Sequence, residues 1–176
     1  MEWLDDTERN AWLTLAFGAG RLLDTLEREL VSAHGLTLSD YGILAMLSHG
    51  GCDGLRMSDL AEGALVSRSR LTHRVNRLEA EGLVQRVVCE TDRRGFLARL
   101  TPRGHERLAQ AAPTHVEGLR RHLVERLDRS QLEALTAAFS TILEGLGETT
   151  PSARPGVGAP PPSASTAAQV PAARAC

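Results

Sequence analysis

The chain contains no lysine, because all 20 of its basic residues are arginine. It therefore lacks the amine that forms Schiff bases and the lysine that reaches nucleotide phosphates in a phosphate-binding loop. The sequence also shows no glycine-rich phosphate cradle, no nucleophile elbow and no metal-binding HExxH pattern. These absences predict a protein that is not an enzyme and that carries no cofactor.

Aromatic residues, cysteines and long apolar runs are also scarce. Aromatic residues make up 3% of the chain, which is too few for a platform that stacks single-stranded bases. The three cysteines, Cys52, Cys89 and Cys176, form no CxxC pair and are odd in number, so a disulfide framework is not expected. The N-terminus is acidic, and no run of about twenty apolar residues could span a bilayer. We expect a cytoplasmic protein without a membrane partner.

The net charge of −2 conceals an uneven distribution. Residues 56–107 carry eleven arginines and seven acids, whereas residues 1–55 carry three arginines and nine acids. A basic region of this kind indicates a lobe that faces a polyanion, and double-stranded DNA is the first such partner to consider.

Apolar spacing and capping residues predict two helices at the start of the chain. Apolar side chains recur at three-four spacing over residues 4–33, which predicts a long amphipathic helix that Gly35 ends. Thr37 and Asp40 form a capping-box pattern, which predicts a second helix over residues 38–48.

A helix-turn-helix is predicted next. We expect a short third helix over residues 58–64 with Ser58 as its cap, then a turn at Leu65 and Val66, then a fourth helix capped by Ser67. At 100° per residue, the buried stripe of the fourth helix is predicted to consist of Leu71, Val75, Leu78 and Gly82.

The opposite side of this fourth helix is interpreted as a surface for the DNA major groove. Ser69, Arg70 and His73 are the expected base readers, because they lie near the end of the helix that enters the groove. The side chains expected at phosphates are Ser67, Arg68, Arg74 and Arg77. The alternative is a solvated charged face, which is common on exposed helices.

Residues 84–101 predict a β-hairpin whose loop carries Asp92, Arg93 and Arg94. An arginine-tipped loop fits the minor groove, where the negative potential of DNA is concentrated, and a nearby carboxylate can hold the guanidinium in place. The alternative is a polar hairpin turn without a role in binding.

The rest of the chain is predicted to form two more helices and a tail. Pro102, after a Thr101 cap, begins a fifth helix that is expected to reach about residue 127, with a kink at Pro113. A sixth helix is expected over about residues 129–146. Residues 148–176 hold six of the eight prolines, and we expect a disordered tail rich in Pro, Ala and Ser.

The element order and four segments resemble the multiple antibiotic resistance regulator (MarR) family over about residues 4–146. The segments are LTLSDYGILAML, MSDLAEGALVSRSRLTHRVNRLEAEGLV, the DRRG wing tip and LTPRGHERL. The resemblance implies a homodimeric bacterial DNA-binding regulator, more often a repressor than an activator. Many members of the family release DNA when a small ligand binds, so the resemblance also implies a small aromatic or carboxylic effector. It also implies that Arg94 enters the minor groove and that Asp92 orients it.

We therefore predict a mainly α fold with a small β-hairpin wing. A winged helix-turn-helix domain covers residues 37–101, and both chain ends, residues 4–34 and 102–147, form a helical dimerisation region. Such a dimer would present two recognition helices about one DNA turn, or ~34 Å, apart to a pseudo-palindromic operator. Two alternatives are a winged-helix module for protein association and an unselective architectural DNA binder.

Other candidate sites are weaker. A ligand pocket is expected where the first, second and fifth helices meet, with Trp12 and Tyr41 as aromatic walls or as plain core residues. His115 with His122, and His49 with Cys52 and Asp53, do not complete a tetrahedral metal shell, so no metal is expected. Cys89 lies on a wing strand, where an inert thiol is favoured over a redox switch.

Overall fold

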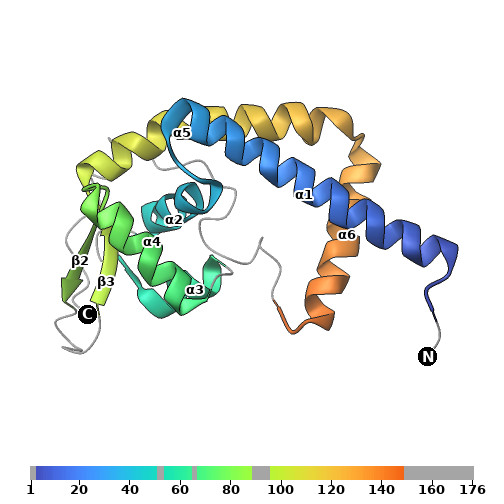
Figure 1. Ribbon diagram of the computed structural model, residues 1–176, viewed down its shortest axis with the longest axis horizontal. Helices are drawn as coiled ribbons and strands as arrows, with labels where there is room; N and C mark the ends of the chain where they lie inside the picture. Colours follow the sequence, from blue (N-terminus) through green and yellow to red (C-terminus); the bar gives the residue numbers. More distant parts are fainter. Residues whose placement is uncertain (1–2, 51–53, 65–66, 89–95, 149–176) are drawn as a thin grey trace.

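The computed structural model describes residues 3–50, 54–64, 67–88 and 96–148 (Figure 1). Several residues named in the sequence predictions lie outside these ranges: Cys52, Asp53, Leu65, Val66, Cys89, Asp92, Arg93, Arg94 and the tail from residue 149. The predictions made for them stay predictions.

The described part of the chain is mostly helical with one small sheet. The helices are α1 (Asp6–His34), α2 (Leu38–His49), α3 (Met57–Gly63), α4 (Arg68–Ala80), α5 (Pro102–His122) and α6 (Arg129–Gly145), with a 3₁₀ turn η1 (Val124–Arg126). The strands are β1 (Leu55–Arg56), β2 (Val84–Val88) and β3 (Phe96–Leu100), in the antiparallel order β1-β3-β2. The predicted mainly α fold with a β-hairpin wing is confirmed. The strand β1 was missed, because two residues are too short to show an alternating pattern.

Capping side chains set most of the helix boundaries. The capping box of α2 is present, with the Thr37 side chain accepting from the Asp40 backbone and the Asp40 side chain accepting from the Thr37 backbone. Ser67 caps α4 as predicted, and Gly35 ends α1 in the left-handed conformation, with φ of +65°. The prediction that Ser58 caps α3 is wrong: α3 begins at Met57, and the Ser58 hydroxyl donates to the neighbouring Asp59.

Helix α5 begins at Pro102 after a Thr101 cap and continues as one α-helix through Pro113. It ends at His122 and not near residue 127. Leu123 leaves the helical conformation, with φ of −126° and ψ of −64°, and the chain forms η1 before α6 begins.

The core lies where α2, α4, α5 and the wing sheet meet. Three residues of the stripe predicted on α4 are confirmed, since Leu71, Val75 and Leu78 are each 0% exposed. Gly82 was wrongly included: α4 ends at Ala80, and Gly82 follows it with a φ of +71° and is half-buried. Burial of side chains of this size stabilises a fold by about 1.5–3 kcal/mol each. The stripe therefore fixes which face of α4 is left for solvent and ligands.

The two chain ends form an extended helical part (Figure 1). Helix α5 packs along α1, and the His34 and Thr114 side chains of the pair share a hydrogen bond of 2.8 Å. Helix α6 follows the C-terminal end of α5 and lies apart from the lobe that holds α2, α3, α4 and the sheet. No residue of α6 is buried, although one face of the helix carries an apolar stripe that includes Leu135, Phe139 and Ile142.

No single helix in the described ranges is long and apolar enough to cross a membrane. Helices α1 and α2 reach the required length and composition only when taken together, across a bend of 78°.

The first turn of α5 requires glycine at position 104. A Cβ added to Gly104 would lie 2.0 Å from the backbone oxygen of Leu83 and 3.1 Å from a methyl carbon of Leu100. Because the nearer atom belongs to the backbone, we expect Gly104→Ala to lower the free energy of unfolding by about 1–3 kcal/mol in urea titrations. Gly42→Ala is the matched control, since a Cβ there meets nothing within 4 Å and should stabilise α2 by about 0.5–1 kcal/mol. A Gly104→Ala variant as stable as the wild type would contradict this packing.

Candidate nucleic-acid interface

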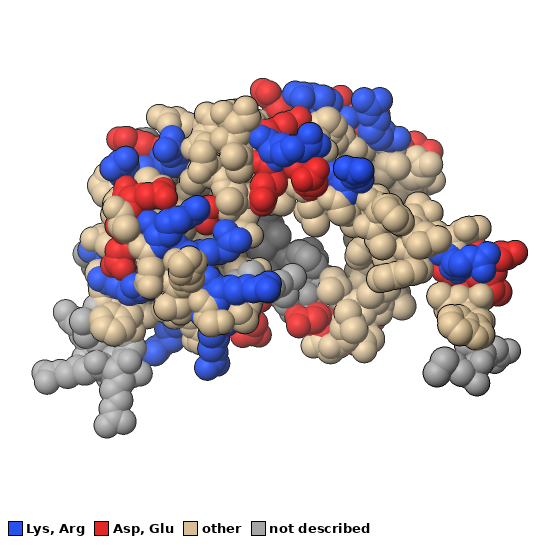
Figure 2. Space-filling model, in the orientation of Figure 1, with Lys and Arg blue, Asp and Glu red and all other residues tan. Residues whose placement is uncertain are grey.

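The predicted DNA-contacting side chains of α4 lie together on its solvent face. Five of them line an open groove of about 600 Å³ between α4 and the start of α2, together with Thr37: Ser69, Arg70, His73, Arg74 and Arg77. Figure 2 shows arginine side chains gathered on the side of the lobe that carries α4. The structure therefore brings the predicted base readers and two of the predicted phosphate-binding arginines into one surface.

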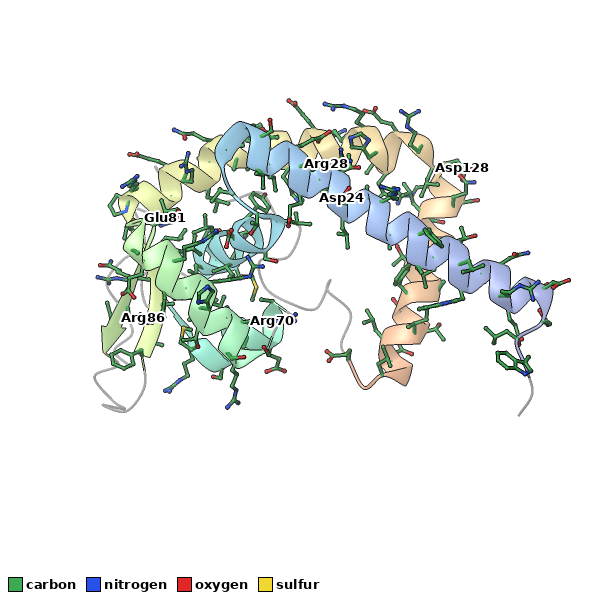
Figure 3. All side chains as sticks on the ribbon, viewed as in Figure 1. Asp24, Arg28, Arg70, Glu81, Arg86 and Asp128 are labelled. Carbon is green, nitrogen blue, oxygen red and sulfur yellow. The ribbon has the colours of Figure 1, made fainter. Side chains whose placement is uncertain are left out.

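The first turns of α4 form the unengaged end of this surface. Arg68, Arg70 and His73 are all exposed. Their side chains make no hydrogen bond or ion pair with any residue that the structure describes. Figure 3 shows Arg70 at the end of α4 beside α3, whereas Glu81 and Arg86 lie at the other end. These three side chains are free to contact a ligand.

The middle of α4 is tied to α2 through Asp40. Arg74 Nη1 donates to Asp40 Oδ1 at 3.3 Å and to Thr37 Oγ1 at 3.0 Å, and Arg77 Nη2 donates to Asp40 Oδ2. Asp40 is 0% exposed, while the Arg74 and Arg77 side chains are 33% and 44% exposed. Arg74 and Arg77 therefore balance the charge of a buried carboxylate. The sequence analysis assigned them to DNA phosphates and did not predict this ion pair.

This role of Asp40 was missed from the sequence. The capping pattern explained the residue locally, and the arginines that pair with it lie 34 and 37 positions further along the chain. The available signal was indirect: Asp40 is the only acidic residue of a largely apolar helix, where an unpaired carboxylate would be costly to bury.

The far end of α4 is tied to the wing. On β2, Arg86 Nη1 donates to Glu79 Oε2 at 2.7 Å, and the Arg86 backbone N–H donates to Glu79 Oε1 at 3.2 Å. Its other terminal nitrogen donates to Asn76 Oδ1. This contact fixes the angle between the helix and the strand that leads into the wing loop.

The two residues proposed as walls of a ligand pocket lie far apart in one chain. Trp12 is 59% exposed in the first half of α1, ~33 Å of helix rise from His34 at 1.5 Å per residue. Tyr41 instead packs on His115 of α5, with ring centroids 4.4 Å apart. Burial raises the pKa of Tyr41 and lowers the pKa of His115. A single chain thus offers Tyr41 with His115, and not Tyr41 with Trp12, as an aromatic pair.

The histidines considered for metal binding have other contacts. His122 Nε2 lies 2.8 Å from Glu29 Oε1, and His49 Nδ1 lies 2.8 Å from the Ala45 carbonyl oxygen. No group of three or more His, Cys, Asp or Glu side chains in the described ranges is placed to hold a metal ion.

The arrangement defines a class of protein. The short helix α3 and the helix α4 precede two antiparallel strands, in which Val84 pairs with Leu100 and Val88 pairs with Phe96. This is a winged helix-turn-helix, in which the second helix of the pair is the one that enters a DNA groove in nucleic-acid-binding members.

Comparison with known proteins gives the family. Residues 34–95 match the MarR family. The crystal structure of AbsC, a MarR family transcriptional regulator from Streptomyces coelicolor, is 42% identical, with a TM-score of 0.78 over 84% of this chain and 99% of that one. Sco3205, a MarR family transcriptional regulator from the same organism solved in complex with DNA, is 38% identical, with a TM-score of 0.80 over 83% of this chain and 91% of that one.

The chain belongs to the MarR family of transcriptional regulators, which are DNA-binding proteins and not enzymes. It is also 30% identical over 100 residues to the transcriptional regulator PecS of Dickeya dadantii, a match that covers 56% of this chain and 60% of PecS. The chain spans about half the length of the first curated relatives that it matches.

The buried His115 ring predicts a pH dependence of stability. Its pKa is lowered in the folded protein from an unfolded value of about 6.5, so protonation favours the unfolded state. Stability should therefore be lost as the pH falls below about 6.5 and approaches the lower folded pKa. We expect the free energy of unfolding to decrease less between pH 7.5 and pH 5 in His115→Gln than in the wild type, as measured by urea titration. Equal decreases in the two proteins would show that His115 is not the group responsible.

Proposed function

We propose that this protein is a sequence-selective regulator of transcription that binds double-stranded DNA with α4 in the major groove. The observation that carries the proposal is the exposed first part of α4, where Arg70 and His73 have no partner among the described residues and line an open groove. An α-helix fits the major groove of B-form DNA, and arginine can bond guanine O6 and N7 with two donors. Ser69 lies beside them and can bond either base edges or phosphates.

The wing completes the proposed interface. Strands β2 and β3 flank residues 89–95, which include Asp92, Arg93 and Arg94. An arginine at such a tip is favoured in a narrow minor groove, and Asp92 would orient the guanidinium of Arg94. The ion pair of Arg86 with Glu79 supports this arrangement, because it holds the wing strand at a fixed angle to α4.

We propose that the active form is a homodimer built from α1, α5 and α6. Helix α6 has no buried residue, and its apolar stripe needs a covering surface. Other exposed apolar side chains of the same helical part are Trp12, Phe17, Leu23 and Val116. A two-fold dimer would place two copies of α4 on successive major grooves of a pseudo-palindromic operator.

The regulatory outcome proposed is repression of its own or neighbouring genes. A dimer seated on a promoter occupies DNA that other proteins need. Release by a small aromatic or carboxylic ligand is the mode of control that the family resemblance implies. Tyr41 of α2 and His115 of α5, whose rings contact each other at an interplanar angle of 42°, are the aromatic residues that such a ligand could meet between these two helices.

The second candidate function is that of a winged-helix module for protein association. Such a module has no need for unpartnered arginines on α4 or an arginine-tipped wing. The charge pattern of this chain therefore favours DNA.

DNA binding is tested by fluorescence-anisotropy titration of the duplex upstream of the protein's own gene and of a scrambled duplex, at several salt concentrations. We expect tighter binding to the first duplex, and we expect Arg70→Ala to remove about 1–3 kcal/mol of that preference by deleting a base contact. Arg9→Ala, which removes an exposed arginine of α1, is the matched control and should keep the preference.

Three outcomes would contradict parts of this proposal. Binding that is steep in salt but equal on both duplexes would indicate an architectural DNA binder. Absence of binding to any duplex would favour the association module. An Arg70→Ala variant that loses affinity equally on both duplexes would make Arg70 a phosphate contact.

The dimer is tested on α6. A glutamate in place of Phe139 puts a charge into the apolar stripe, so we expect Phe139→Glu to shift the protein toward monomer in analytical ultracentrifugation. Ala137→Glu, on the opposite side of the same helix, should remain dimeric. A wild type that is monomeric at all concentrations, or a Phe139→Glu variant that dimerises as well as Ala137→Glu, would remove α6 from the interface.

A further inference from the structure

We propose that Asp40 is a positioning residue for DNA recognition. It binds Arg74 and Arg77, fixes α4 on α2, and withdraws both arginines from the set that contacts phosphates. Base reading then falls to the first turns of α4. This inference rests on the proposed function, and it adds a division of roles along α4.

The geometry around Asp40 is closed. Oδ1 accepts from Arg74, and Oδ2 accepts from Arg77, from the Thr37 hydroxyl and from the Thr37 backbone N–H, the last at 3.1 Å. Thr37 Oγ1 in turn accepts from Arg74 Nη1 and from the Asp40 backbone N–H. Both carboxylate oxygens therefore have donors, and those donors come from the start of α2 and from the middle of α4.

Charge balance explains why the arginines remain in place. A buried carboxylate that loses its partners is strongly destabilising, because it is left without solvent or a counter-charge. Arg77 is held from a second side, since its Nε lies 3.7 Å from Glu81 Oε1. If either arginine moved to a DNA phosphate, the buried Asp40 carboxylate would lose one of its two positively charged partners. The internal contact is thus favoured over a phosphate contact at these two positions.

The remaining polar side chains of α4 show the same division. Asn76 and Glu79 bind Arg86 of β2, so the second half of the helix is engaged on both flanks. Arg68, Arg70 and His73, at the beginning of the helix, have no partner among the described residues. A helix held at its middle and far end presents its first turns in a defined direction, which is what discrimination between base pairs requires.

The experiment measures salt dependence and selectivity together. Affinities for the selected duplex and for a scrambled duplex are determined at several salt concentrations for the wild type, Arg74→Gln, Arg77→Gln and Asp40→Asn. Each phosphate contact contributes about 0.9 to the slope of log affinity against log salt concentration. Arg68→Gln, which removes an exposed arginine at the helix start, is the positive control for the loss of one such contact.

The proposal predicts that Arg74→Gln and Arg77→Gln keep the wild-type salt slope but lose about tenfold of their preference for the selected duplex, the effect of a misplaced base contact. Asp40→Asn keeps the shape of the side chain and removes its charge. Its preference should fall similarly, and its slope should steepen as the two arginines are released.

Arg68→Gln should lower the slope by about 0.9 on both duplexes. Asp24→Asn, an exposed acid on α1 paired with Arg28, should match the wild type and so control for the added charge.

Other results would overturn the proposal. If Arg74→Gln or Arg77→Gln lowers the slope by about 0.9 with equal losses on both duplexes, these arginines are ordinary phosphate contacts. Unchanged preference in Asp40→Asn with an unchanged melting temperature would also refute it. Each arginine variant leaves Asp40 with the other arginine and with the Thr37 donors, so these variants decide the question even if Asp40→Asn does not fold. A wild type that selects no duplex removes the proposed function and this inference together, whereas the outcomes above remove the inference alone.

Discussion

The burial of one carboxylate constrains the whole DNA-facing lobe. Asp40 has no access to solvent, so its charge must be balanced inside the protein. Among the described residues its basic partners are Arg74 and Arg77, and both come from α4. The same residue closes the cap of α2. Helix α4 is thus positioned by an ionic contact on one face and by the leucine and valine stripe on the other.

This arrangement separates the roles of neighbouring arginines that look equivalent in the sequence. Those in the middle of α4 support the helix, and Arg86 on β2 supports the wing against it. Those at the start of α4 stay exposed and available. A chain without lysine suits such a scheme, because the planar guanidinium donates to two acceptors at once and remains charged when it is partly buried. Arg74, which bonds both Asp40 and Thr37, is an example.

The sequence predicted what depends on local patterns. Thr37 with Asp40, Ser67 and Gly35 marked helix boundaries through short-range hydrogen bonds and backbone conformation, and three-four spacing identified the buried stripe of α4. Contacts between distant segments were not predictable in this way: β1 exists only because Leu55 pairs with Ala98, and the partners of Asp40 lie on another helix. The prediction that Ser58 caps α3 failed because α3 begins one residue earlier, at Met57, directly after β1. For the candidate site, the residue types were predictable, but their division into supporting and exposed groups was not.

The central claim is that the first turns of α4 read DNA while Asp40 retains its arginines. A crystal structure of the protein bound to a duplex that it selects tests this most directly. The account predicts α4 in the major groove with Arg70 and His73 facing base edges, and Arg74 and Arg77 still bound to Asp40. A complex in which α4 lies away from the groove, or in which both arginines have left Asp40 for phosphate oxygens, would contradict it.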